Sequence, residues 1–202
     1  MYTLVEKRLI KRAVKIFIGE TLFLIIGTII TYFVNPLEDV TRDIASKTPE
    51  SISEEEGLFK VWGFIKNNAF AVPLQILFLS IIPIPYLNFI VLIRTIITPA
   101  ILFGVLLNIS LYKGIVGIIA AIPHYTLEVF GFCVILSSLY ELNKAIVRKL
   151  TNLFRKHKKD NYSIIKAFKA FLIAYLVLAL PMIVIAAFLE TYLADWIFRL
   201  FN

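Results

Sequence analysis

The sequence predicts an all-α integral membrane protein, a bundle of about five transmembrane helices with a cytoplasmic N-terminus. First, 59% of the 202 residues are hydrophobic and 17% are charged, against ~45–50% and ~25% in soluble chains. Second, the apolar residues form runs close to the ~20 residues that cross a hydrocarbon core. Third, charged segments separate these runs. The composition excludes a soluble enzyme, a disordered chain and a disulfide-stapled secreted domain, and the single cysteine excludes an intramolecular disulfide.

The first expected span covers residues 16–34 and follows a basic segment, 1–15. The apolar part of a signal peptide is only ~7–15 residues long and ends at a small-residue cleavage site, which is missing here, so the helix is expected to be retained. Glu20 lies near the basic edge of this span and is expected to reach towards Lys15 or the membrane surface. The acidic outer loop, 35–57, follows with seven acidic and two basic residues.

Three further spans are expected at 67–92, 96–112 and 114–141, where ionisable residues are sparse. The first of them contains Pro83 and Pro85. Because proline removes a backbone donor and breaks helices, this span is expected either to be broken or to end at Pro83.

A basic inner loop, 143–169, separates these spans from the last one, 170–194, which ends near the aromatic residues Tyr192 and Trp196. Basic loops stay in the cytoplasm. Five spans keep the N-terminal segment and the loop 143–169 inside, whereas six spans would place the basic loop outside. The whole chain, 1–202, is then one membrane domain.

The net charge of +7 lies in segments that flank apolar runs. It therefore indicates membrane topology, and no nucleic-acid partner is expected. The partners expected are the lipid bilayer and other membrane proteins.

His124 and Glu128 are one helical turn apart and lie on one helix face. Small residues continue that face at Gly114, Gly117, Ala121 and Gly131, as in a helix-packing seam. Ionisable side chains inside a membrane usually face the protein interior. The pair is expected to be a structural contact, or else to share a proton or to bind a metal or a cationic substrate group.

Polar residues of other spans are expected to meet this pair from the outer half of the membrane. The predicted intramembrane polar site consists of Asn68, Gln75, Asn108, His124, Glu128 and Glu190. Interhelical hydrogen bonding is the simplest role of Asn68 and Asn108. His-Glu-x-x-His, Gly-x-Ser-x-Gly and glycine-rich phosphate loops do not occur, so no catalytic residue is assigned. No cofactor is expected except a possible divalent metal, with His124, Glu128 and Glu190 as candidate ligands.

Residues 123–128, Pro-His-Tyr-Thr-Leu-Glu, resemble the Pro-His-Gly-x-x-Glu signature of the stage II sporulation protein M family. Asn67-Asn68, the Gly104 and Asn108 pair, and residues 186–190 also resemble family patterns, so the likeness covers Phe64–Tyr192. Tyr125 departs from the family glycine, and its ring would narrow any approach to His124.

The resemblance implies a multi-pass protein of a prokaryotic cytoplasmic membrane, typically with five helices. The founding member is similar to a scaffold in a complex that recruits peptidoglycan hydrolases, and other relatives accompany peptide-bacteriocin clusters, often near an ABC transporter. We therefore expect a non-enzymatic component of a membrane complex, which serves cell-envelope or peptide export and immunity systems. An ABC transporter or further copies of the chain are the possible partners. The alternatives are a transport accessory protein and an intramembrane enzyme or metalloprotein that acts on a hydrophobic peptide through His124 and Glu128.

Overall fold

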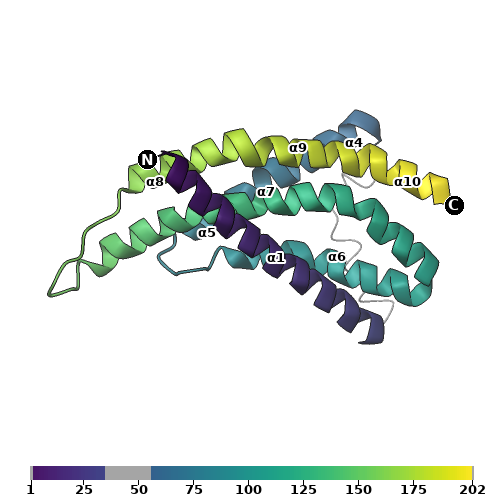
Figure 1. The fold of residues 1–202 in the computed structure, drawn as a ribbon, viewed down its shortest axis with the longest axis horizontal. Helices are drawn as coiled ribbons and strands as arrows, with labels where there is room; N and C mark the ends of the chain where they lie inside the picture. The colour runs from purple at the N-terminus through teal and green to yellow at the C-terminus, as the bar shows by residue number, and fades with distance from the viewer. Residues whose placement is uncertain (1, 35–55, 202) are drawn as a thin grey trace.

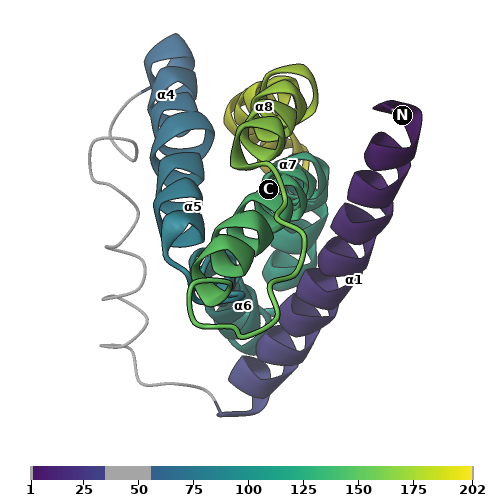
Figure 2. The ribbon, with the colours of Figure 1, turned by 90° about the vertical axis from the view of Figure 1, so that its left-hand side faces the viewer.

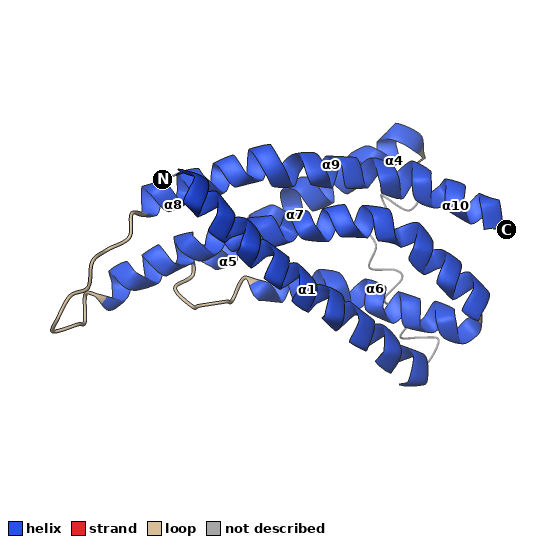
Figure 3. Ribbon diagram, in the orientation of Figure 1, coloured by secondary structure: helices blue, strands red, loops and turns tan. Residues whose placement is uncertain are grey.

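The computed structural model describes residues 2–34 and 56–201, and this part of the chain consists of helices joined by short loops, without a strand (Figure 3). The first rod is α1 (Tyr2–Val34), and the second is formed by α4 (Gly57–Phe64), the π-helical segment η1 (Ile65–Ala71) and α5 (Val72–Ile81). The next two are α6 (Phe89–Ile109) and α7 (Leu111–Thr151). The last rod is formed by α8 (Ile164–Ala174), η2 (Tyr175–Ala179), α9 (Leu180–Phe188), η3 (Leu189–Leu193) and α10 (Ala194–Phe201).

Each of the five rods is long and apolar enough to cross a membrane. They cover Lys7–Val34, Gly57–Ile81, Phe89–Ile109, Leu111–Thr151 and Ile164–Phe201. The prediction of an all-α protein with about five membrane-spanning helices is therefore confirmed.

The helices end at different residues from the expected spans. The helix expected over 67–92 runs from Gly57 to Ile81, and Pro83 and Pro85 lie in the loop that follows it. The segment 143–169, which was expected to be a loop, is helical up to Thr151 and again from Ile164. The reason is that hydropathy marks the hydrocarbon boundary, whereas a helix satisfies its own backbone and can continue into the polar interface. The expected acidic loop lies almost wholly outside the described residues.

Helix α7 is the central element of the bundle. It contacts α1 and α6 on one side, and α5 and the last rod on the other. Figure 2 shows this arrangement end-on, with α1 and the α4–α5 rod on opposite sides of α7. The middle of α7, from Phe132 to Leu136, is fully buried. The core of the bundle thus lies along α7.

The N-terminus and the loop 152–163 lie at one end of the bundle, and the C-terminus lies at the other (Figure 1). The structure therefore brings the two basic segments of the sequence to the same end. This is the arrangement that five crossings require. The assignment of that end to the cytoplasm stays a prediction.

Small residues allow the closest helix contacts. A Cβ added at Gly104 of α6 would lie 2.5 Å from the Cβ of Thr31 and 2.7 Å from the backbone oxygen of Thr28, both on α1. A Cβ added at Gly131 of α7 would lie 2.9 Å from Cγ1 of Ile183 on α9. The predicted packing seam is thus used at Gly131, where α9 approaches.

We predict that Gly104→Ala destabilises the protein by about 1–3 kcal/mol, the usual effect of overpacking, because α1 and α6 have to separate. Thermal unfolding in detergent, followed by circular dichroism, measures the effect. Gly19→Ala is the matched control, since nothing lies within 4 Å of the added Cβ and alanine favours a helix more than glycine does. Equal melting temperatures of the Gly104→Ala variant and the wild type would contradict the close contact.

Candidate functional site

The centre of the candidate site is a hydrogen bond between two helices. Nδ2 of Asn68 on η1 donates to Oε2 of Glu128 on α7 over 2.8 Å. Nδ2 of the neighbouring Asn67 donates to Oδ1 of Asn68 over 2.7 Å. Because Asn67 occupies the carbonyl oxygen of Asn68, the amide nitrogen of Asn68 is directed towards the carboxylate.

Asn68 lies on a π-helical segment whose position follows from a proline. Pro73 has no N–H, and its ring would clash with the carbonyl of Ala69 in a regular α-helix. Local π-helical geometry and side chains of neighbouring helices accommodate such prolines within membranes. Here Oη of Tyr175, on η2 of the last rod, donates to the carbonyl oxygen of Ala69 over 2.5 Å. The turn that carries Asn68 is therefore held by two contacts, one from Asn68 to Glu128 and one from Tyr175 to Ala69.

Glu190 reaches the same region from η3, the third π-helical segment of the described residues. It lies near enough to Glu128 and Lys60 to interact with both electrostatically. Nζ of Lys60 also lies 4.0 Å from Oδ2 of Asp195 in an ion pair between α4 and α10. Asn68, Glu128 and Glu190 thus come from three rods to one region of the bundle. π-Helical turns are frequent at functional sites, and Asn68 and Glu190 each lie on such a turn.

The structure does not bring Gln75 and Asn108 into this group. Oε1 of Gln75 accepts from the guanidinium of Arg94 over 3.0 Å. Nδ2 of Asn108 donates to the backbone oxygen of Tyr32 on α1 over 2.9 Å. Helix faces alone could not show this, because the neighbour of each face depends on how the helices are arranged.

His124 and Glu128 lie on α7 as expected, but among the described residues Glu128 is hydrogen-bonded to Asn68 rather than to His124. Nδ1 of His124 and Oη of Tyr125 are buried and have no hydrogen-bond partner in the described part of the chain. The ring of Tyr125 lines an apolar cavity of about 210 Å³ together with residues of α1 and α6, such as Leu24 and Phe103.

Glu20 is placed differently from the prediction that it reaches towards Lys15 or the membrane surface. Its side chain is only 8% exposed, and it lies near enough to Tyr125 and Cys133 to act on them electrostatically. The face of α1 on which Glu20 lies could have indicated this burial from the sequence. Ala13, Thr28 and Thr31 are buried on the same face.

Two further polar contacts of α7 were missed because each depends on a distant segment. Arg12 of α1 donates to Oε1 of Glu141 over 2.6 Å and to the backbone oxygen of Ser137 over 3.0 Å. Nδ2 of Asn143 donates to the backbone oxygens of Ser80 and Ile82, over 2.9 and 2.8 Å. The latter satisfies carbonyl groups at the end of α5, where the proline-rich loop begins.

The candidate metal ligands are not grouped in the described part of the chain. Within residues 2–34 and 56–201, no three His, Cys, Asp or Glu side chains are grouped so as to hold a metal ion. His124, Glu128 and Glu190 are therefore not arranged as one set of ligands. What the arrangement does chemically is to link helices through amide and carboxylate groups.

The family model described as stage II sporulation protein M matches residues 8–195, which is nearly the whole chain. Neither the comparison with curated proteins nor that with solved structures found a match.

We predict that Asn68→Ala lowers stability by about 0.5–2 kcal/mol, the range for polar contacts between membrane helices, because Glu128 loses its hydrogen-bond donor. Thermal unfolding in detergent measures the change. The double variant Asn68→Ala/Glu128→Leu is the control, since removing both partners is less costly than leaving one unpaired. If the changes in the free energy of unfolding caused by Asn68→Ala and by Glu128→Leu alone add up to that of the double variant, the hydrogen bond does not contribute to stability.

Proposed function

Because the chain belongs to the stage II sporulation protein M family, we propose that it is a non-enzymatic, multi-pass component of a prokaryotic membrane complex. In this proposal it holds or assists partner proteins of a cell-envelope or peptide export and immunity system. The polar site holds the bundle together, and the outer faces and ends of the bundle bind the partners.

The observation that carries the proposal is the contact of Glu128 with Asn68. The carboxylate of Glu128 is engaged by another helix of the same chain. Neither the 210 Å³ cavity beside Tyr125 nor a second cavity, between α5 and α6, is lined by Asn68, His124, Glu128 or Glu190. An interhelical contact that positions the rods accounts for this arrangement.

The basic end of the bundle is well suited to contact partners. Asn152 organises the loop 152–163, since its Nδ2 donates to the backbone oxygen of Lys159 over 2.6 Å. Leu153 and Phe154 are 71% and 90% exposed on this loop, among the basic residues Arg155, Lys156, Lys158 and Lys159. Such a loop offers both apolar and charged contacts outside the hydrocarbon core.

A transport accessory protein or an intramembrane enzyme that uses His124 and Glu128 is the second candidate. The observation in its favour is the buried Nδ1 atom of His124, which has no partner among the described residues. Such an atom is free to exchange a proton with a substrate or to bind a cation.

The two candidates predict different results for the double variant His124→Ala/Glu128→Gln. Under our proposal the variant keeps its partners, because the amide oxygen of glutamine still accepts from Asn68. Quantitative mass spectrometry after cross-linking in host membranes compares its partners with those of the wild type. Leu153→Ser/Phe154→Ser is the contrasting variant and is expected to lose partners. A monodisperse double variant that has lost all partners would contradict the proposal.

Elemental analysis of the purified protein tests the metalloprotein alternative directly. We predict that the wild type and the double variant carry the same substoichiometric metal content, because the candidate ligands are not grouped. About one metal ion per chain in the wild type, and none in the double variant, would favour the enzyme over the scaffold.

A further inference from the structure

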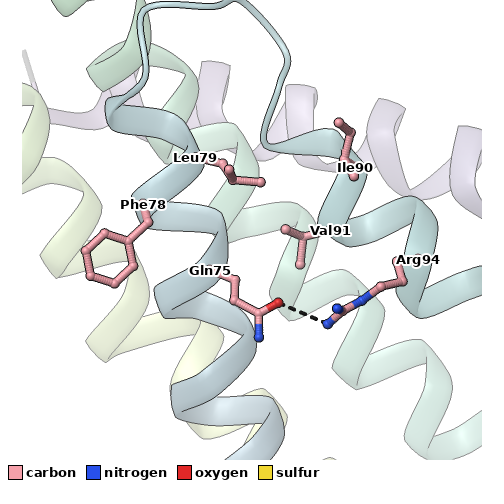
Figure 4. A pocket seen from close by; sticks show the side chains of 6 residues that line it. All are labelled: Gln75, Phe78, Leu79, Ile90, Val91 and Arg94. Atoms are coloured by element: carbon pink, nitrogen blue, oxygen red, sulfur yellow. Dashed lines mark hydrogen bonds between the residues drawn. The ribbon is translucent and has the colours of Figure 1, made fainter. Parts of the chain in front are cut away.

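A charged side chain lies on the outer face of the bundle, in the cleft between α5 and α6. Figure 4 shows the cleft and the hydrogen bond of 3.0 Å from the guanidinium of Arg94 to Oε1 of Gln75. The cleft has a volume of about 340 Å³, and its other lining residues are apolar: Phe78, Leu79, Ile90 and Val91. Arg94, Phe78 and Ile90 are exposed, so this surface faces whatever surrounds the protein.

The position of Arg94 along α6 places its charge inside the hydrocarbon region. Helix α6 has 21 residues, which gives a length of about 31 Å at ~1.5 Å per residue. This length matches the ~30 Å thickness of a hydrocarbon core. Residues 89–93, between the start of α6 and Arg94, are all apolar, so the hydrocarbon region extends to Phe89. The Cα of Arg94, five residues further along α6, therefore lies about 7–8 Å inside it.

Gln75 keeps the guanidinium at that depth. It lies six residues before Ile81, the last residue of α5, which corresponds to about 9 Å. The guanidinium is thus held towards Gln75 instead of extending to the membrane surface. Figure 4 shows the same order, with Leu79 and Ile90 nearer the connecting loop than Gln75 and Arg94.

A charge held there needs a counter-charge. Charged side chains within membranes pair with one another or face a protein interior, whereas Arg94 is exposed and bonds only to the neutral Gln75 among the described residues. The described carboxylates of this chain that lie within its helices are engaged elsewhere or buried, as with Glu128, Glu141 and Glu20. A carboxylate from a different chain would supply this counter-charge.

We infer that the cleft between α5 and α6 binds a transmembrane helix of another protein that carries one Asp or Glu. The acid lies about two turns inside the partner's end, level with Arg94, and apolar residues between it and that end pack on Leu79 and Ile90. A lipid phosphate fits less well, because the apolar Leu79 and Ile90 lie between Arg94 and the end of the helices that is nearer the connecting loop. The inference rests on the proposed function, and it names the chemistry of the partner.

A synthetic transmembrane peptide tests the inference. The probe is a leucine-rich helix with a single Glu six residues from one end and a dansyl group at the other, and the matched peptide has Gln in place of Glu. Energy transfer from the tryptophans of the protein to the dansyl group, in phosphatidylcholine liposomes, measures binding. We expect the Glu peptide to bind the wild type at least tenfold more tightly than the Gln peptide does.

Variants of the chain complete the test. Arg94→Gln is expected to abolish the preference for the Glu peptide, and Arg94→Glu is expected to bind a Lys peptide instead. Lys113→Gln is the matched control, because Lys113 is an exposed base in the first turn of α7, which follows the opposite end of α6. Circular dichroism and monodispersity establish that each variant is folded.

Two results would overturn the inference. The first is equal binding of the Glu and Gln peptides by the wild type. The second is Arg94-dependent binding of phosphatidylglycerol without Arg94-dependent binding of the Glu peptide, which would assign the cleft to a lipid phosphate. In either case, retention of cross-linked partners by Arg94→Gln would show that the proposed scaffold function stands independently.

Discussion

Lipid tails are as apolar as leucine side chains, so the hydrophobic effect contributes little to the association of two helices within a bilayer. The bundle depends instead on hydrogen bonds and close contacts made by α7. Its side chains bond to three neighbours: Glu128 to η1, Glu141 to α1 and Asn143 to the end of α5. Gly131 adds close packing against α9. With α7 as the common partner, the other rods acquire defined positions.

Prolines determine where these contacts form. Pro73 disrupts the backbone bonding of the second rod, and the π-helical segment before it presents Asn68 to α7. Pro83 and Pro85 follow the end of α5, and Asn143 satisfies the carbonyl groups there. Within a membrane each unsatisfied backbone group costs several kcal/mol, as a rough measure, so every disruption requires a polar partner. Asn143 and Tyr175 are such partners, since they donate to the carbonyl oxygens of Ser80, Ile82 and Ala69.

The polar groups therefore fall into two classes with different roles. Those at the centre, such as Asn68 and Glu128, bond to each other across helices and maintain the fold. Arg94 differs because its charge lies on an outer face beside an apolar cleft. Exposed Phe154 and the basic residues around it lie on the loop 152–163. A protein that binds partners within and beside the membrane is consistent with this division.

The sequence by itself determined the all-α class and the number of membrane-spanning helices, because hydropathy and helix length are local properties. The expectation that six polar side chains converge on one site rested on the tendency of polar groups within a membrane to face the protein interior. The tertiary structure alone decided the neighbours: Gln75 with Arg94, Asn108 with Tyr32, and Glu20 beside Tyr125 rather than near Lys15. The helix face on which a polar residue lies indicates that its side chain is directed into the bundle. Which helix it meets there depends on the packing of distant segments and on π-helical turns that no periodic pattern reveals.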